Sequence, residues 1–335
     1  MRRFTDDAWQ NGWRVAVLAN DAIGNFVVAT PLLQRIRETK PASLHYFGGV
    51  RTRELEDASD LPDRTFPLHG SSLQSAYESV RDDLPFDVVV NLEQTPHSAA
   101  FASLIGEGAR IVGPCLAPDG RGELPFEAGS RGDLWRDTQW VAENLPARFP
   151  MLQTGFIGEI FCRLAYFDGP IPPYRVPSAS PTRPVPDVLV ACSASLPEKL
   201  WPEARWLEAL AQLKQRGVSI GVLGAPKASQ GRYWKGGTVE DVVIDRGLAS
   251  DLRGAFTLPQ VVGALGKARA VLTLDNGILH LAAATATPTI GLFREGIHRL
   301  WCPPAPNVRA LVPESGDAVA SIEPSRVVGA VNDAL

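Results

Sequence analysis

The chain has 335 residues, 45% hydrophobic and 21% charged, which is the composition of a globular protein long enough for two domains. A net charge of −4 provides no basic surface for nucleic acid, so we expect no nucleic-acid partner. No apolar run reaches the roughly 18 residues that span a bilayer, so we expect no membrane span.

The first half alternates apolar runs with amphipathic stretches. Runs of valine and isoleucine bounded by helices favour parallel strands covered on both faces. The predicted strands are 14–19, 44–47 and 86–91, and the predicted helices are about 25–39, 72–82, 133–144 and 154–166.

The segment 170–186 contains seven prolines and reads as an extended linker, because proline fixes φ and removes a backbone donor. After it the same alternation begins again. The predicted strands are 187–191, 218–223, 270–274 and 288–293, and the predicted helices are 203–215, 258–267, 278–285 and 324–335.

Each half therefore predicts an α/β domain with an open parallel sheet, which binds ligands outside the carboxyl ends of its strands. The predicted organisation is an N-terminal Rossmann-like domain at 1–169, the linker at 170–186, and a C-terminal Rossmann-like domain at 187–335. The packing partner of the last helix stays open, and the N-terminal domain is one of the candidates.

The four cysteines, at 115, 162, 192 and 302, form no Cys-x-x-Cys pair, and no histidine stands at metal-ligand spacing. This favours free thiols over a disulfide or metal site. The N-terminus lacks the apolar segment of a signal peptide, so we expect a cytoplasmic protein without a metal.

The clearest ligand-binding pattern is Asp275-Asn276-Gly277, where strand 270–274 turns into a helix. We expect Asp275 to be the N-cap, because its carboxylate can accept unpaired backbone N–H groups. Gly277 lets a ligand approach the backbone, and a helix N-terminus attracts anions. The pattern fits a phosphate or diphosphate site and an ordinary capped turn about equally.

Four segments, 14–38, 191–213, 251–275 and 270–293, together resemble glycosyltransferase family 9, the bacterial lipopolysaccharide heptosyltransferases. The resemblance rests on Asp275, Gly277, His280, Thr287, Pro288 and Phe293, and on Lys199, Trp201 and Pro202. It implies the GT-B fold, with the acceptor bound by the N-terminal half and an ADP-linked sugar by the C-terminal half. It also implies a metal-independent inverting reaction without a cofactor, the nucleotide sugar being a substrate.

A nucleotide-sugar donor leaves as a diphosphate, whose negative charge needs hydrogen-bond donors or cations. The candidates are Lys199, the hydroxyls of Ser193 and Ser195, and the N–H groups of Asn276 and Gly277. The resemblance assigns donor-sugar hydroxyls to Asp275 and places Gln230 where relatives bind ribose with a glutamate. A buried structural role for His280 is at least as well supported as a ligand contact.

The acceptor half departs from the family pattern. Relatives carry a catalytic aspartate after Gly24, whereas this chain has Asn25, and an amide cannot accept the acceptor's proton. Asn25 could instead cap the helix or bind a sugar. We hypothesise that Glu93 or Asp21 is the base, with His97 a third candidate on the acceptor side.

A second departure is Arg294, which follows strand 288–293 where relatives read Gly-Pro. It could clamp a diphosphate or an anionic acceptor, or be a plain surface arginine. The leading prediction is a glycosyltransferase of lipopolysaccharide biosynthesis that moves a sugar, first of all a heptose, to a glycan or natural-product hydroxyl. The alternatives are a sugar-nucleotide-binding protein that has lost its chemistry, or a nucleotide-sugar epimerase. The sequence leaves the oligomeric state open.

Overall fold

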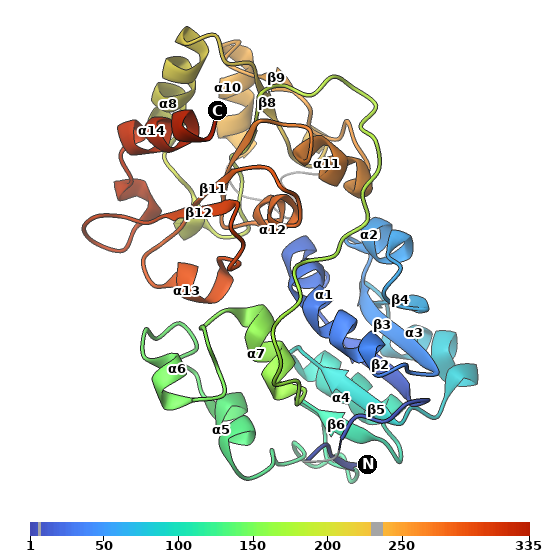
Figure 1. Ribbon diagram of the computed structural model, residues 1–335. Helices are drawn as coiled ribbons and strands as arrows, with labels where there is room; N and C mark the ends of the chain where they lie inside the picture. Colours follow the sequence, from blue (N-terminus) through green and yellow to red (C-terminus); the bar gives the residue numbers. More distant parts are fainter. Residues whose placement is uncertain (6–7, 229–236) are drawn as a thin grey trace. The chain divides into compact units, whose positions relative to one another are not determined.

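The computed structural model describes residues 1–5, 8–228 and 237–335, which form two compact units, Met1–Arg175 and Val176–Leu335 (Figure 1). The division falls inside the proline-rich segment 170–186, in which no helix or strand occurs. Each unit is an α/β body built on its own parallel sheet. None of the helices in the described ranges is long and apolar enough to cross a membrane.

The described strands of the N-terminal unit form one six-stranded sheet in the order β1-β6-β5-β2-β3-β4. All neighbours run parallel. The strands are β1 (Arg2–Arg3), β2 (Arg14–Leu18), β3 (Ser43–Gly49), β4 (Arg64–His69), β5 (Val88–Asn91) and β6 (Arg110–Val112).

Helices cover both faces of this sheet. Phe47 and Phe66 on one face pack with Phe101 of α4, while Tyr46 on the other face meets Phe26 of α1. Helix α7 lies beside α1 (Figure 1). The helices are α1 (Ile23–Glu38), α2 (Arg53–Ala58), α3 (Leu73–Val80), α4 (Pro96–Ile105), α5 (Ser130–Arg136), α6 (Leu145–Arg148) and α7 (Ile157–Leu164), with a 3₁₀ turn at Arg81–Asp83.

The C-terminal unit repeats this plan, with its described strands in the order β12-β11-β10-β7-β8-β9, again all parallel. The strands are β7 (Val188–Ala191), β8 (Ile220–Val222), β9 (Ser250–Asp251), β10 (Ala270–Leu274), β11 (Thr289–Leu292) and β12 (Val308–Leu311).

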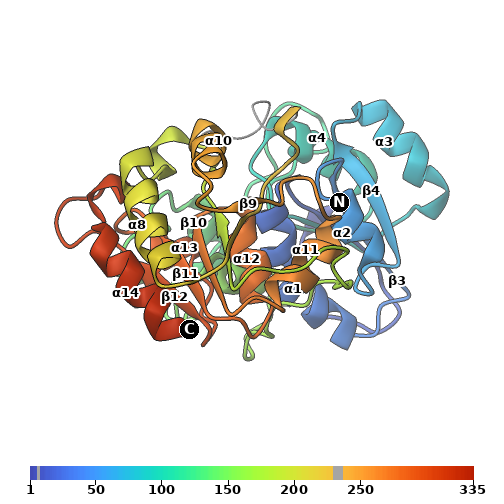
Figure 2. The same ribbon diagram turned by 90° about the horizontal axis from the view of Figure 1, so that it is seen from above.

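Helices α8 and α14 pack side by side on the C-terminal sheet (Figure 2), so the last helix belongs to this unit. The fully buried Trp201 anchors the start of α8 by donating its indole N–H to the Ile322 carbonyl at 2.9 Å. The helices are α8 (Glu203–Gln215), α10 (Gly237–Asp245), α11 (Leu258–Leu265), α12 (Gly277–Ala283), α13 (Ile297–Trp301) and α14 (Pro324–Ala334), with 3₁₀ turns at Pro197–Lys199 and Val319–Ser321.

In both sheets, the order in which the chain adds strands reverses between the two central strands. The chain builds outward from β2 to β4 and then returns to place β5 against the other edge of β2, and β7 and β10 stand in the same relation. Such a reversal opens a crevice at the carboxyl ends of the two central strands, where open α/β sheets bind ligands. Within each unit, these strand ends are the place to look for a site.

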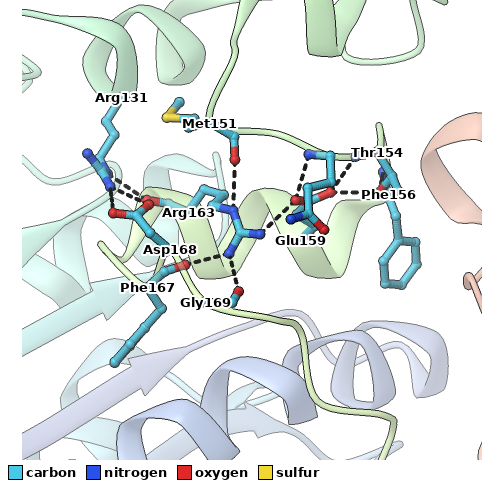
Figure 3. A network of polar contacts seen from close by, with 10 residues as sticks. Arg131, Met151, Thr154, Phe156, Glu159, Arg163, Phe167, Asp168 and Gly169 are labelled. Carbon is cyan, nitrogen blue, oxygen red and sulfur yellow. Dashed lines mark hydrogen bonds and ion pairs between the residues drawn. The ribbon is translucent and has the colours of Figure 1, made fainter.

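A buried ion pair holds α7 to the loops around it (Figure 3). Arg163 donates to Glu159 at 2.8 Å and to the carbonyls of Met151, Phe167 and Gly169 at 2.9, 2.7 and 2.8 Å. The Glu159 carboxylate also accepts the backbone N–H groups of Gln153 and Thr154. Both charged side chains are 1% exposed, and each of their charged nitrogen and oxygen atoms makes at least one hydrogen bond, so the network has a structural role.

The predicted helix at 133–144 is wrong. Helix α5 ends at Arg136, and residues 138–144 have no helix. Asp137 ends it, because its side chain accepts the backbone N–H of Gln139 at 2.6 Å and offers the chain a turn in place of the helical pattern.

Candidate active site

The carboxyl ends of β7 and β10 bring together the residues predicted to bind a diphosphate. The register pairs Ala191 with Thr273, so Ser193 and Asp275 leave the sheet side by side. Asn276 joins the two ends, because its amide donates to the Ser193 carbonyl at 2.9 Å. Ser193 is buried, whereas Ser195, two residues further on, is exposed.

The N-cap of α12 is Asn276, so the prediction of Asp275 as the cap is wrong. The Asn276 side-chain oxygen accepts the N–H groups of Ile278 and Leu279 at 2.9 and 3.4 Å. Because the cap lies one residue later than expected, the Asp275 carboxylate is left for another partner. Gly277 is the first residue of the helix and is partly exposed.

That partner is Lys199, whose Nζ lies 2.7 Å from Oδ2 of Asp275 and 3.5 Å from the Asp275 carbonyl oxygen. The side chains of Lys199 and Asp275 are 17% and 6% exposed, so the charges are largely shielded from water. Lys199 is the last residue of the 3₁₀ turn Pro197–Lys199. The pair places a cation and a carboxylate together at the strand ends.

His280 is buried behind this pair, on α12, with its ring 6.3 Å from that of Trp301. Burial lowers the pKa of His280 to about 4, against the opposing charge of Asp275. A neutral, buried imidazole fits a structural role better than a contact with an anion.

Two further donor-side predictions have different outcomes. Arg294 follows β11 and is partly exposed, and its Nε atom is buried without a hydrogen-bond partner among the described residues. Gln230 lies outside the described residues. In those ranges, no group of three or more His, Cys, Asp or Glu side chains is arranged to hold a metal ion.

In the N-terminal unit, the ends of β2 and β5 bring Asn20 and Glu93 together. Leu18 pairs with Asn91 in the sheet, and two residues later Asn20 donates to Glu93 Oε2 at 3.2 Å. The Asn91 side chain supports this strand end, since its oxygen accepts the Glu93 N–H at 3.0 Å. Burial raises the pKa of Glu93, while the hydrogen bond from Asn20 opposes the increase.

Asp21 has a different environment, because Arg51 at the end of β3 binds both of its carboxylate oxygens. Burial raises the pKa of Asp21, but the hydrogen bonds and charge of Arg51 outweigh it, so that the pKa is lowered overall. A carboxylate in a bidentate ion pair is a weak base.

Asn25 lies in the first turn of α1, whose N-cap is Ala22, so Asn25 does not cap the helix. Its side chain makes no hydrogen bond with any residue in the described part of the chain, and Gly24 precedes it in the same turn. His97 is the second residue of α4, and its ring lies 5.9 Å from that of His69 and its Nε2 3.4 Å from the Leu68 carbonyl.

Sequence reasoning missed Asn20, Arg51, His69 and Glu56. Asn20 and Arg51 follow strands and His69 is the last residue of β4, all at the ligand-binding edge, a position that could have identified them. Glu56 lies in α2, 1% exposed, and its Oε1 accepts the Gly49 N–H at 3.3 Å and the Thr52 hydroxyl. Burial raises the pKa of Glu56 to about 7.

Parts of the chain are similar to known glycosyltransferases. Residues 175–321 match the model of glycosyltransferase family 9 (heptosyltransferase). Lipopolysaccharide heptosyltransferase 1 of Pseudomonas aeruginosa is 34% identical over 100 residues, which cover 28% of this chain and 25% of that protein. In this match the chain therefore spans a quarter of the length of its curated relative.

The solved structures that are similar over nearly the whole chain include two glycosyltransferases. A family 9 glycosyltransferase from Veillonella parvula has a TM-score of 0.74 and 13% identity, covering 98% of this chain and 99% of that one. The E. coli heptosyltransferase WaaC with ADP has a TM-score of 0.65 and 15% identity, covering 96% and 100%. The expected α/β fold with two Rossmann-like units, as in GT-B heptosyltransferases, is confirmed.

Proposed function

We propose that this chain is an inverting, metal-independent glycosyltransferase of the cytoplasm, because it is similar to the glycosyltransferase family 9 heptosyltransferases. In this proposal it moves a sugar from an ADP-linked donor, a heptose being the first candidate, to a hydroxyl of a glycan or natural product. Lipopolysaccharide is the first acceptor to test, since the curated relative is named for it.

The observation that carries the proposal is the Lys199–Asp275 pair at the carboxyl ends of β7 and β10. When the donor breaks, the diphosphate takes the electron pair of the sugar–oxygen bond and its negative charge grows. A largely buried lysine stabilises that charge far better than one in water. The hydroxyls of Ser193 and Ser195 and the N–H of Gly277 would add hydrogen bonds, so the proposal needs no metal.

Asp275 gains a role of its own in the same step. Once Lys199 turns to the diphosphate, the carboxylate is free to accept hydrogen bonds from hydroxyls of the donor sugar. ADP as the nucleotide is supported by the E. coli relative, whose structure was determined with ADP. Arg294, whose buried Nε has no hydrogen-bond partner among the described residues, is a further candidate for the diphosphate or an anionic acceptor.

One observation favours a second candidate, a protein that binds sugar nucleotides without transferring them. Asn25 stands where the family pattern has its catalytic acid, and it has no proton-accepting group. Such a protein would keep the donor site at β7 and β10 and lack turnover.

The test is a thermal-shift screen of the purified chain with ADP, GDP, UDP and dTDP, followed by a transfer assay with ADP-heptose and lipopolysaccharide core acceptors. A ligand at a hundredfold excess over its dissociation constant stabilises the native state by about 2.7 kcal/mol. We expect ADP to raise the melting temperature most. No shift with any nucleotide would remove the donor site, and binding of ADP-heptose without transfer to any acceptor would support the second candidate.

A further inference from the structure

A carboxylate that follows β5, Glu93, lies at the same end of the sheet as the loop that leads from β2 into Asn25. We infer that Glu93, held by Asn20, accepts the proton of the acceptor hydroxyl in place of the residue at position 25. The inference rests on the proposed transferase function and goes beyond it, because it assigns the base. It starts from the register of β2 and β5, which places residues 20 and 93 opposite each other at the crevice of the N-terminal sheet.

The Glu93 carboxylate is available for proton transfer. Its side-chain partner is the neutral amide of Asn20, at 3.2 Å from Oε2, and among the described residues no cation pairs with it. The side chain is partly exposed, so a hydroxyl can reach it. Burial raises its pKa, which makes the ionised form a stronger base than a carboxylate in water.

Asn20 is a positioning residue whose orientation is fixed. Its side-chain oxygen accepts the Ala22 N–H at 3.1 Å at the start of α1, so the NH₂ group faces Glu93. The amide therefore joins the end of β2 to the proposed base and donates to its charged form. The same loop leads from β2 into Asn25 in the first turn of α1. Asn25 therefore follows β2 and Glu93 follows β5, at the same edge of the sheet.

Asp21 is excluded as the base by its partner. Arg51 occupies both carboxylate oxygens, and a proton can be accepted there only if that ion pair opens. The Asp21 side chain is also packed against the chain, because a Cβ on Gly49 would lie 2.0 Å from the Asp21 Cβ. Its negative charge still matters, since it adds to the raised pKa of Glu93.

His97 is less suited than Glu93. Its Nε2 lies 3.4 Å from the Leu68 carbonyl, and that contact favours the tautomer with the proton on Nε2. His97 belongs to α4, and its ring lies beside that of His69, the last residue of β4. Strand β4 is at an edge of the sheet, and β3 separates it from β2 and the crevice.

The proposed step balances without a further reactant. The acceptor O–H bond breaks and its proton moves to the Glu93 carboxylate. The acceptor oxygen forms a bond to the anomeric carbon, while the bond from that carbon to the diphosphate breaks and its electron pair leaves with ADP. No group is oxidised or reduced.

The experiment compares Glu93→Gln with Glu107→Gln, the same chemical change at an exposed turn of the same unit. General-base catalysis contributes about 10²–10⁴-fold, so we expect kcat of Glu93→Gln to fall by at least about 100-fold while the KM for the donor and the ADP thermal shift stay unchanged. Asp21→Asn, whose folding is checked by its melting temperature, should keep kcat within about tenfold of the wild type. The remaining change is expected because loss of the Asp21 charge lowers the pKa of Glu93 and makes it a weaker base.

Asn20→Ala provides a readout that a purely structural role would not give. Loss of the amide removes a hydrogen bond to the ionised carboxylate, so the acid limb of the kcat–pH profile should move to higher pH. The acid limb should disappear in Glu93→Gln and return in Glu93→Asp with a lower kcat. The pH profile of Glu93→Asp also tests the assignment if Glu93→Gln does not fold.

The outcomes separate the two proposals. A wild-type chain that transfers sugar while Glu93→Gln keeps its kcat overturns the assignment of the base and leaves the function standing. An acid limb that Asn20→Ala does not move overturns it as well. A wild-type chain without transfer to any acceptor removes the proposed function, and the base assignment fails with it.

Discussion

Lys199 and Asp275 form an ion pair at 2.7 Å in the C-terminal unit, although they lie 76 residues apart in the chain. Each shields the other's charge in a site that is largely closed to water. The pair thus combines two roles that mutagenesis can separate, stability of the fold and affinity for an anionic ligand.

Lys199→Met should weaken both. It leaves the buried Asp275 carboxylate without a cation, which lowers the free energy of unfolding by about 2 kcal/mol. The double variant Lys199→Met/Asp275→Asn should recover most of that loss, because the unpaired charge is gone. The affinity of both variants for ADP, measured by titration calorimetry, should be at least tenfold below that of the wild type. Lys214→Met, an exposed lysine of the same unit, is the control. ADP affinity at the wild-type level in the double variant would contradict a role for Lys199 in binding the diphosphate.

Glu56 should make the stability of the chain depend on pH. Its pKa is about 7 in the folded protein and 4.5 as the ordinary value, so the folded state binds its proton more tightly than the unfolded state. The stabilisation is complete below pH 4.5 and is lost as the pH rises through 7, by about 3 kcal/mol in total. Chemical denaturation between pH 5 and 8 measures it.

Glu56→Gln should flatten this profile and be more stable than the wild type at pH 8, because the amide stays neutral. Glu54→Gln, an exposed residue of the same helix α2, should leave the slope unchanged. A wild-type profile that is as flat as that of Glu56→Gln would show that the carboxyl titrates normally.

Arg163→Met should destabilise the N-terminal unit strongly. The substitution removes four hydrogen bonds and leaves the 1% exposed Glu159 without its cation, a change that costs about 3–5 kcal/mol. Arg136→Met, which breaks an exposed pair with Asp133, should cost under about 1 kcal/mol. Urea denaturation compares the two, and equal losses would contradict the structural role of the buried network.

Strong periodicity made many elements predictable. The strand at 270–274 and the helix at 203–215 occur with the predicted bounds. Strand β4 was missed because Pro67 reads as a strand breaker. Pro67 is tolerated because β4 lies at an edge of the sheet. On its outer side no neighbouring strand needs the backbone N–H that proline lacks.

The candidate site was predictable only in part, because its contacts depend on strand order. Glu93 was found because it follows a predicted strand, and Lys199 because it matches the motif of the resembling family. The pairing of Asn20 with Glu93 was not, since it requires β5 to return beside β2. The bidentate bond from Arg51 to Asp21 likewise depends on β3 being the other neighbour of β2. A shift of one residue in the cap, from Asp275 to Asn276, was beyond the resolution of a sequence pattern.

The side chain of Asn276 has a consequence for how a ligand would be received. It caps α12 with its oxygen and holds the Ser193 carbonyl with its nitrogen, so the two strand ends are fixed to each other before any ligand arrives. The conformational entropy of arranging them is lost when the chain folds, and binding need not reduce it again. In Asn276→Ala the two strand ends of the empty site would no longer be held together, so binding would have to order them. Calorimetry should then show a less favourable binding entropy, although Lys199 and its charge are still in place.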